Sequence, residues 1–328
     1  MKNTPDDKDL AAQLLVYFKD ETHSLYMALS QDGYSFTALN AGEPVMDGRN
    51  LAEQKGIRDV HISRGPDGAF YLAMTDLHIY ARREGLRDTG WERDNKDYGW
   101  GNNRGLVFMK SADLISWSRT NVRVDQAFPS LENIGCAWAP QVIYDAEQKK
   151  LMLHFTMRFG GGLNRLYYSY VDDAFTKLET EPKLLFEYPK EVSYIDSDII
   201  QVGDKFHLFY VPHDGPPGIK HAVSDSLTSG YVYDPADCDP EPLACEAPNV
   251  WKRIGEAKWV LMYDTYSVEP HNFGFCETTD FITFTPIGRF NEGVMKAVNF
   301  TSPKHGSVIP LTQTEASQLA DHWKLERF

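Results

Sequence analysis

The sequence predicts an all-β fold, a five-bladed β-propeller whose four-stranded antiparallel blades surround a central channel. Three observations support this prediction. A short phrase recurs five times along the 328 residues, a second kind of segment recurs five times between its copies, and aromatic residues make up 13% of the chain. Aromatic residues favour strands. Repetition at intervals of this kind is typical of architectures in which each unit is one small sheet.

The first repeated phrase is an apolar run that leads into a Ser/Thr/Val-x-Asp-like turn and ends in an aromatic or apolar residue. Each copy predicts an outer strand, a tight Asp turn and the start of another strand. The five copies are Leu25–Phe36, Leu106–Trp117, Leu166–Phe175, Ile219–Tyr231 and Phe273–Phe284.

The second repeated segment starts with polar character and is followed, after a turn, by a strongly apolar strand. We expect it to form the inner strand of a blade, and the apolar strand after it to form the middle one. A blade then contains four strands. The five copies are Arg58–Ile62, Trp138–Tyr144, Ile195–Ile200, Glu246–Trp251 and His305–Ile309.

The two ends of the chain each lack part of a blade. The last inner strand, His305–Ile309, has no strand after it, and the strands expected near 14–18 and 24–30 have no inner strand before them. The simplest prediction is that the N- and C-terminal strands pair in one blade, because this closes the ring and leaves only short edges.

The ring accounts for the whole chain, so we expect a single catalytic domain over 1–328. A loose tail or short helix is predicted at 1–11. The one convincing helix is Thr314–Trp323, within a C-terminal helix and tail at 314–328, with Thr312 or Thr314 as its N-cap.

The composition excludes some classes of partner. The chain has 33 Lys and Arg against 47 Asp and Glu, a net charge of −14. Such an acidic surface argues against nucleic acid phosphates and anionic membranes as partners. The sequence contains no run of 18 apolar residues, so we expect no membrane span. The polar N-terminus predicts no signal peptide, so we expect a cytoplasmic protein, or a periplasmic or secreted one if the chain is a processed form.

The cysteines and glycines indicate no metal or nucleotide cofactor. Cys136, Cys238, Cys245 and Cys276 fit no zinc-binding spacing. Cys238 and Cys245 could close a loop disulfide, although free thiols are the expectation without an export signal. The run Gly160–Gly162 lacks the lysine of a P-loop.

A long charged stretch, Asp76–Arg104, lies between the middle and outer strands of one blade. Loops of this length are often functional. Two interpretations remain open. The stretch either forms one wall of a cleft, with Trp91 and Trp100 as stacking platforms for a sugar, or it is a solvated insertion.

Polar residues of the inner strands are expected to converge in the channel. They are Asp59, Gln141, Asp196, Glu246 and His305. A single Asp at a strand start is usually a turn or cap residue, but three carboxylates at equivalent points of repeated units form a candidate site. One carboxyl group, kept protonated, can protonate the leaving oxygen of a glycoside, while an ionised one activates water or attacks the sugar. A third can tune and orient the acid.

With these residues the chain resembles glycoside hydrolase family 43, a family of five-bladed propellers, from about residue 14 to 313. Asp59 in IRDVHI matches the general base of the family, with Val60 in place of the usual proline. Asp196 in YIDSDI matches the Asp that tunes and orients the acid, and Glu246 in EAPNVW matches the general acid. The phrases WAPQ and KHGSVIP also fit, although Gln141 is neutral where an acidic residue is common.

The resemblance implies inversion of the anomeric centre. Asp59 would deprotonate water, Glu246 would protonate the leaving group, and Asp196 would hold Glu246 protonated, with acid and base about 6.5–9.5 Å apart. No cofactor is required. His305 has three open interpretations: it helps to hold a structural calcium ion through waters, it hydrogen-bonds a carboxylate or the sugar, or it is a core histidine.

Further sugar contacts are predicted from the aromatic and amide residues near these motifs. The candidates are Trp138, Gln141, Tyr194 and Trp100, and Trp138 and Tyr194 could equally be core aromatics. His61 follows Asp59 at i+2, so it is expected to share the face of Asp59.

The predicted function is an exo-acting or debranching glycosidase that removes α-L-arabinofuranosyl residues from plant polysaccharides or oligosaccharides. A β-xylosidase is the main alternative, and an exo-β-1,3-galactosidase or endo-arabinanase is a further one. A non-catalytic carbohydrate-binding propeller would lack an acid–base pair. A phosphorylase would need a basic cluster beside the sugar.

Overall fold

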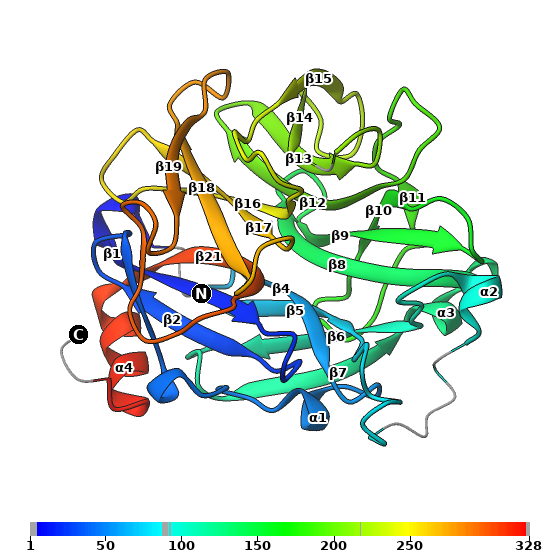
Figure 1. The fold of residues 1–328 in the computed structure, drawn as a ribbon, viewed down its shortest axis with the longest axis horizontal. Helices are drawn as coiled ribbons and strands as arrows, with labels where there is room; N and C mark the ends of the chain where they lie inside the picture. The colour runs from blue at the N-terminus through cyan, green and yellow to red at the C-terminus, as the bar shows by residue number, and fades with distance from the viewer. Residues whose placement is uncertain (1–4, 87–90, 92, 217, 326–328) are drawn as a thin grey trace.

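The strands of the computed structural model form five sheets around a central axis, which confirms the predicted five-bladed propeller (Figure 1). The structure describes residues 5–86, 91, 93–216 and 218–325. Four sheets contain four consecutive antiparallel strands each, and the fifth combines strands from both ends of the chain. The first strands of neighbouring blades contact one another around the axis, so these are the inner strands.

Four blades follow one another along the chain, each listed here from the inner strand outward. The first is β4 (Ile57–Arg64), β5 (Phe70–Asp76), β6 (Gly105–Ser111) and β7 (Trp117–Arg123). The second is β8 (Ile134–Asp145), β9 (Lys150–Phe159), β10 (Arg165–Tyr170) and β11 (Lys183–Leu184). The third is β12 (Tyr194–Val202), β13 (Lys205–Pro212), β14 (Lys220–Ser224) and β15 (Val232–Asp237). The fourth is β16 (Glu246–Lys252), β17 (Trp259–Thr265), β18 (Asn272–Thr278) and β19 (Thr285–Arg289).

The fifth sheet, here called the closing blade, joins the two ends of the chain as predicted. Its order is β20-β3-β2-β1-β21, and Leu14 of β1 lies opposite Ile309 of β21. The expected tail at 1–11 is shorter than predicted, because the ladder extends to the pair Leu10–Thr312. The strands are β1 (Leu10–Phe18), β2 (Tyr26–Ser30), β3 (Ser35–Ala38), β20 (Lys296–Ala297) and β21 (Lys304–Thr312).

The C-terminal helix α4 (Gln313–His322) packs beside the closing blade (Figure 1). Thr312 is its N-cap: the Thr312 hydroxyl accepts from the N–H of Glu315, and the Glu315 carboxylate accepts from the N–H of Thr312. No helix among the described residues is long and apolar enough to cross a membrane. The remaining helices are short: η1 (Asp7–Asp9), η2 (Asn40–Gly42), α1 (Gly48–Leu51), α2 (Asn95–Tyr98), α3 (Val124–Ala127) and η3 (Pro129–Leu131).

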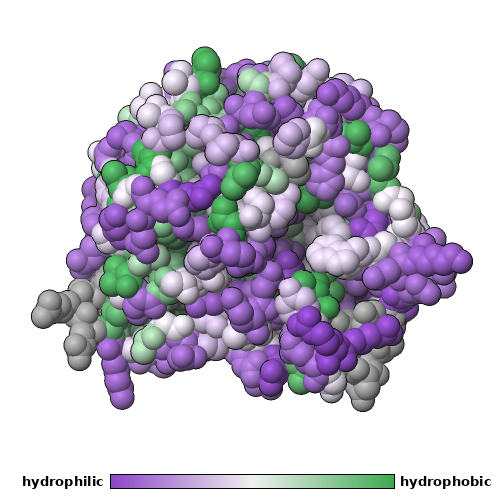
Figure 2. Space-filling view, viewed as in Figure 1, coloured by the Kyte–Doolittle hydropathy of each residue, from purple (hydrophilic) through white to green (hydrophobic). Residues whose placement is uncertain are grey.

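The hydrophobic core is divided among the interfaces between neighbouring blades. Phe108 of the first blade and Phe155 of the second belong to one such cluster, and Tyr210 of the third blade packs in another. The four cysteines lie buried in the molecule and are free, so the expected thiols are confirmed over a Cys238–Cys245 disulfide. The face seen in Figure 2 is largely hydrophilic, with hydrophobic residues in small scattered groups.

Each inner strand contains a β-bulge at an equivalent place. The ladder slips between Arg58 and His61 in the first blade, and the residue after Arg58 takes a positive φ. Side-chain alternation therefore does not carry across the bulge, so the i+2 argument that placed His61 beside Asp59 has no geometric basis. The residues with positive φ, here called the bulge residues, are Asp59 (53°), Ala139 (46°), Asp196 (52°), Ala247 (57°) and His305 (31°).

Side chains two residues after the bulges link neighbouring blades. Four of the five accept a hydrogen bond from a backbone N–H of a neighbouring inner strand. The links run from Ile62 N to Ser307 Oγ (2.8 Å), from Val142 N to His61 Nδ1 (3.2 Å), from Val250 N to Asp198 Oδ2 (2.6 Å) and from Val308 N to Asn249 Oδ1 (2.9 Å). The fifth such residue is Gln141, and within the described part of the chain its buried Oε1 has no hydrogen-bond partner.

Candidate active site

A small solvent-open cavity of about 80 Å³ is formed where the inner strands begin to bulge. The residue just before the bulge contributes to the lining in four of the five blades. The lining residues are Arg58, Asp59, Leu77, Trp100, Trp138, Ile195, Asp196 and Glu246. The structure thus brings together the three predicted carboxylates and two of the predicted aromatic contacts.

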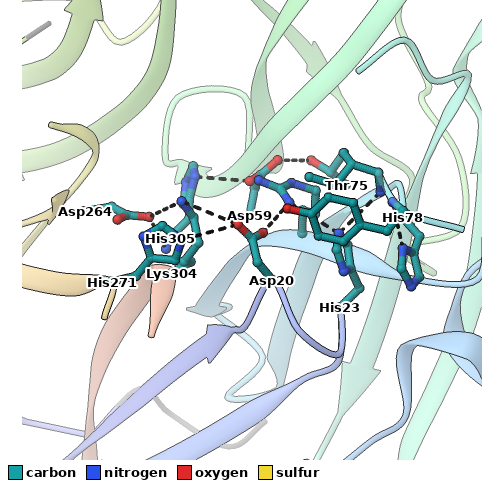
Figure 3. Close-up of polar contacts among 12 residues, drawn as sticks. Asp20, His23, Asp59, Thr75, His78, Asp264, His271, Lys304 and His305 are labelled. Carbon is teal, nitrogen blue, oxygen red and sulfur yellow. Dashed lines mark hydrogen bonds and ion pairs between the residues drawn. The ribbon is translucent and has the colours of Figure 1, made fainter. Parts of the chain in front are cut away.

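Asp59 is held from two sides. Thr75 of the neighbouring strand donates its hydroxyl proton to Asp59 Oδ2 (2.7 Å), and Nδ1 of His305 lies 3.3 Å from Asp59 Oδ1 (Figure 3). Thr75 is itself fixed, because its Oγ1 accepts from the N–H of Ala139 in the next blade (2.9 Å). The position of the carboxylate therefore depends on three blades.

Asp59 and His305 form a charged pair. Burial alone would raise the pKa of Asp59, but the charge and hydrogen bond of His305, together with the Arg58 charge, hold that pKa below its usual range. Burial alone would lower the pKa of His305, but the Asp59 carboxylate raises it to about 9. At neutral pH Asp59 is thus ionised, as a base must be, and His305 is protonated.

Asp196 differs from Asp59 although both are bulge residues. Its N–H donates to Thr156 Oγ1 (3.1 Å), and its Oδ2 lies 3.9 Å from His305 Nδ1. Burial, aided by the negative charges of Glu246 and Asp59, raises the pKa of Asp196 to about 8. At neutral pH this group carries a proton. Two carboxyl groups in one cavity therefore have opposite protonation states.

Glu246 lies on the same cavity, one residue before the bulge of the fourth blade. Its side chain is 26% exposed, more than that of Asp59 (14%) or Asp196 (8%). Oε1 of Glu246 lies 4.0 Å from the ammonium of Lys304. Asp264 is its direct cross-strand partner. Glu246 is thus the carboxyl group with the greatest access to a ligand that enters the cavity.

Two tryptophans form an aromatic wall. Trp100 is 62% exposed, and its ring meets that of Trp138 edge to face at 6.0 Å. Trp138 donates its indole N–H to the carbonyl of Gly101 (2.9 Å), and the Arg158 guanidinium lies 4.6 Å from its ring centre. Part of the long insertion therefore does line the cavity. Residues 87–90 and 92 of that insertion lie outside the described residues.

Three predicted sugar contacts are not part of the cavity lining. Tyr194 is 1% exposed and donates its hydroxyl to the carbonyl of Phe186 (2.7 Å), so it is a core aromatic. Gln141 is buried two residues beyond the bulge, where Trp138 takes the place expected for it. Trp91 is buried, with Arg123 over its ring at 4.7 Å. The predictions for Tyr194 and Trp91 assumed exposed side chains, but the packing buries both. The prediction for Gln141 assumed regular alternation of side chains, which the bulge interrupts.

The surroundings of His305 do not form a direct calcium site, and the predicted contact to calcium through waters stays a prediction. A metal-binding imidazole must offer a neutral nitrogen, whereas the two carboxylates that face Nδ1 favour the protonated ring. Calcium also requires six to eight oxygen ligands. Among the described residues, no group of three or more His, Cys, Asp or Glu side chains is arranged to hold a metal ion. His305 is therefore treated below as the ion-pair partner of Asp59.

Sequence reasoning missed several residues that build the site. Arg58 lines the cavity and donates to Asp20 Oδ1 (2.6 Å). Lys304 lies between Asp264 (3.6 Å; Figure 3) and Glu246 (4.0 Å). A signal was present in the repeats. In every inner strand one residue directly precedes the bulge residue, and these residues are Arg58, Trp138, Ile195, Glu246 and Lys304. The residues opposite the first four of them are Thr75, Thr156, Val211 and Asp264.

Comparison with known proteins identifies the family. A family model of the glycosyl hydrolase 43-related group, described as a probable glycosyl hydrolase domain, matches residues 8–317. An α-L-arabinofuranosidase of Bifidobacterium longum is 25% identical over 215 residues, which cover 61% of this chain and 18% of that protein. The match therefore spans less than a fifth of that relative's length.

Solved structures share the fold. A GH43 protein of Bacillus licheniformis has a TM-score of 0.59 at 14% identity, covering 89% of this chain and 57% of that one. An α-L-arabinofuranosidase of Clostridium thermocellum has a TM-score of 0.57 at 12% identity, covering 82% and 84%. The match to the family model includes every carboxylate of the cavity. The chain belongs to the glycosyl hydrolase 43-related family and is thus a member of a glycoside hydrolase family.

Proposed function

We propose that this protein is an inverting, exo-acting glycosidase that removes α-L-arabinofuranosyl residues from plant-type oligosaccharides or polysaccharides. The observation that carries the proposal is the shared cavity of Asp59, Asp196 and Glu246, in which the pKa of Asp59 is lowered and that of Asp196 is raised. Glycoside hydrolysis requires an ionised base and an acid that reaches the leaving oxygen. Asp59 meets the first requirement, and Glu246, the most exposed of the three carboxyl groups, is assigned to the second.

In the proposed reaction, Asp59 takes a proton from a water molecule while that water attacks the anomeric carbon. The bond to the leaving oxygen breaks, and Glu246 transfers its proton to that oxygen. Asp196 supplies a neutral neighbour in the same cavity, so that negative charge is concentrated on Asp59, beside the His305 imidazolium. Asp59 then releases its proton to solvent, and Glu246 is reprotonated, which restores the starting state.

The cavity also supports binding of a terminal sugar. Trp100 and Trp138 offer an aromatic wall, on which the apolar face of a sugar ring can stack, and Arg58 offers hydrogen-bond donors. The cavity is small and Trp100 of the long insertion borders it, which favours binding of a single terminal sugar and so exo action. The name of the Bifidobacterium relative supports arabinose as the sugar.

The test is release of 4-nitrophenol from the α-L-arabinofuranoside and the β-D-xyloside by wild type, Asp59→Ala and Glu246→Ala. We expect preferential cleavage of the arabinoside. Asp59→Ala should lose nearly all activity, whereas Glu246→Ala should retain more, because an activated leaving group needs little acid assistance. Proton NMR of the first sugar released should show inversion.

The other outcomes separate the parts of the proposal. Preferential cleavage of the xyloside would leave the proposed mechanism in place and would make xylose, not arabinose, the sugar removed. Retention of the anomeric configuration would contradict the roles of Asp59 and water. Activity that survives in Asp59→Ala would reject this cavity as the active site. If neither glycoside is cleaved, a panel of natural oligosaccharides decides between another linkage and a binding-only propeller.

A further inference from the structure

We propose that Lys304 is a positioning residue for Glu246, and that Asp264 anchors this lysine on its far side. The inference rests on the proposed function, because it concerns how the proton donor of that reaction is held. Nothing in the sequence motifs assigned a role to either residue.

The repeat geometry first draws attention to Lys304. The residue before the bulge lines the cavity in the first four blades, where it is Arg58, Trp138, Ile195 or Glu246. In the closing blade this residue is Lys304, which does not line the cavity and is only 4% exposed. Its long side chain is directed instead to carboxylates beside the cavity.

Three carboxyl groups, two from the fourth blade and one from the closing blade, surround the ammonium of Lys304. Its Nζ lies 3.6 Å from Asp264 Oδ2, 3.9 Å from Asp20 Oδ2 and 4.0 Å from Glu246 Oε1. The ring of Tyr266 also lies within cation–π range, at 5.8 Å. Glu246 is the only member of this group that also lines the cavity. The ammonium thus lies close to the proposed proton donor without itself lining the cavity.

Asp264 makes this arrangement specific to Glu246. The two residues are direct cross-strand partners on β16 and β17, so their side chains lie on the same face of the sheet. Asp264 is fully buried, and its Oδ2 also accepts from the N–H of His305 (3.2 Å). Asp264 therefore holds the backbone at His305, the residue after Lys304. It is also the carboxyl group nearest to the Lys304 ammonium.

The network extends to the opposite wall of the cavity. Asp20 pairs with Lys304 and also accepts from Arg58 (2.6 Å), which itself lines the cavity (Figure 3). Acidic and basic side chains therefore alternate from Glu246 through Lys304 and Asp20 to Arg58. Burial alone would lower the pKa of Lys304, but its carboxylate neighbours raise it, so the ammonium stays charged. A buried ammonium is unfavourable without such partners. The partners of Lys304 include Glu246, the proposed proton donor, and Asp20, which also binds Arg58 of the cavity lining.

A positioning role makes a prediction that a purely structural ion pair does not. If Lys304 orients Glu246, its loss should impair protonation of the leaving group and should slow substrates that need protonation most. We expect Lys304→Met to lower kcat on an unactivated arabino-oligosaccharide by roughly 10- to 100-fold, and kcat on the 4-nitrophenyl glycoside by less than about threefold. KM should change little for either substrate.

Conservative and charge-balanced variants keep the test decisive if Lys304→Met folds poorly. Lys304→Arg should recover most of the kcat on the oligosaccharide, because it restores the cation. The double variant Lys304→Gln, Asp264→Asn removes the ammonium together with its nearest carboxyl partner and should still show the leaving-group difference. The matched control is Lys220→Met, which breaks the ion pair of the half-buried Lys220 with the exposed Asp237 (2.9 Å) in the outer strands of the third blade and should leave both rates unchanged.

Two results would overturn the inference. One is an equal loss of kcat on both substrates in Lys304→Met and in the double variant, which indicates a general structural defect. The other is wild-type behaviour in both variants. Failure of the proposed function looks different, since wild type would then cleave no glycoside, or Glu246→Ala itself would show no leaving-group difference.

Discussion

The outer turns and the inner bulges of this propeller repeat equally often, but they depend on the sequence in opposite ways. In the outer turns of three blades the same side chains recur, because they form the turn. Ser111 Oγ accepts from the N–H of Leu114 (2.9 Å), and Asp113 Oδ1 accepts from the N–H groups of Ile115 (2.9 Å) and Ser116 (2.7 Å). The equivalent pairs are Ser30 with Asp32 and Thr278 with Asp280.

The inner bulges keep one backbone shape with different side chains. Their residues are Asp, Ala, Asp, Ala and His, all with positive φ. The contacts that hold them come from other strands, as when Thr75 and Thr156 accept from the N–H groups of Ala139 and Asp196. The comparison teaches that recurring side chains mark local stabilisation, whereas changing side chains on a constant backbone mark the site.

The largest effect expected is on activity at an inner bulge. Asp59→Asn should lower kcat at least roughly 1,000-fold, because an amide cannot accept the proton of the attacking water. Steady-state kinetics on the 4-nitrophenyl arabinofuranoside measures it. The matched control is Asp113→Asn in the outer turn of the same blade, which should keep wild-type kcat. A similar loss of kcat in both variants would contradict the division between site and scaffold.

The links below the bulges should affect stability and not chemistry. Asn249→Ala leaves the buried N–H of Val308 without its acceptor, so the free energy of unfolding should fall by about 2 kcal/mol. Urea denaturation with an unchanged m-value measures this, and kcat at 25 °C should remain near wild type. A change below about 0.5 kcal/mol would mean that this link adds little to the joining of the blades.

The charged pair at the site should make stability fall with rising pH. His305 loses its proton near pH 6.5 when unfolded but near 9 when folded, so the unfolded state binds fewer protons between these values. The raised pKa of Asp196 acts in the same direction up to about 8. The buried histidines with lowered pKa values titrate near pH 6.5 in the unfolded chain. Above pH 7.5 they therefore add little to the change of the free energy of unfolding with pH.

Between pH 7.5 and 9 His305 alone should therefore lower the free energy of unfolding by about 1–2 kcal/mol, and the four buried cysteines, whose pKa values burial raises, add to the fall as the pH approaches 9. Urea titrations at three pH values in this window measure the slope. His305→Gln should reduce the slope by the contribution of the imidazole. An equal slope in wild type and variant would show that the imidazole is not held in its charged form.

The smallest effect expected is at an outer turn. Asp113→Ala removes the acceptor for two exposed N–H groups that water can also satisfy, so the free energy of unfolding should fall by only about 1 kcal/mol. Thermal unfolding measures this, with kcat unchanged. A loss of activity without a loss of stability would show that the turn and the cavity are coupled.

Much of the fold could be predicted because its signals are local. Apolar alternation and Asp turns located the outer and middle strands, and the unpaired ends of the chain predicted the closing blade that joins β1 and β21. The lengths of terminal elements were less certain: β1 begins at Leu10 because the ladder with β21 continues to Thr312. Ladder length depends on a partner 300 residues away, which a local pattern does not contain.

The candidate site divides in the same way. Motifs and composition identified five residues that line one cavity, namely Asp59, Asp196, Glu246, Trp138 and Trp100. Tyr194 and Gln141 were assigned to the sugar by proximity in sequence, but the bulge and the core packing bury them. Their roles depended on which way each strand turns after its bulge, and a one-residue shift reverses that direction.

By itself, the sequence determined the number of blades, the order of their strands and the identity of three carboxylates, because repetition and residue type are written along the chain. Only the tertiary structure decided the protonation of those carboxylates and the partners that hold them. Asp59 and Asp196 occupy equivalent bulges, yet their pKa values move in opposite directions, since one faces the His305 imidazolium most closely and the other is dominated by burial and neighbouring negative charge. Electrostatic energy depends on distances across the channel between residues far apart in the chain, and those distances exist only once the ring has closed.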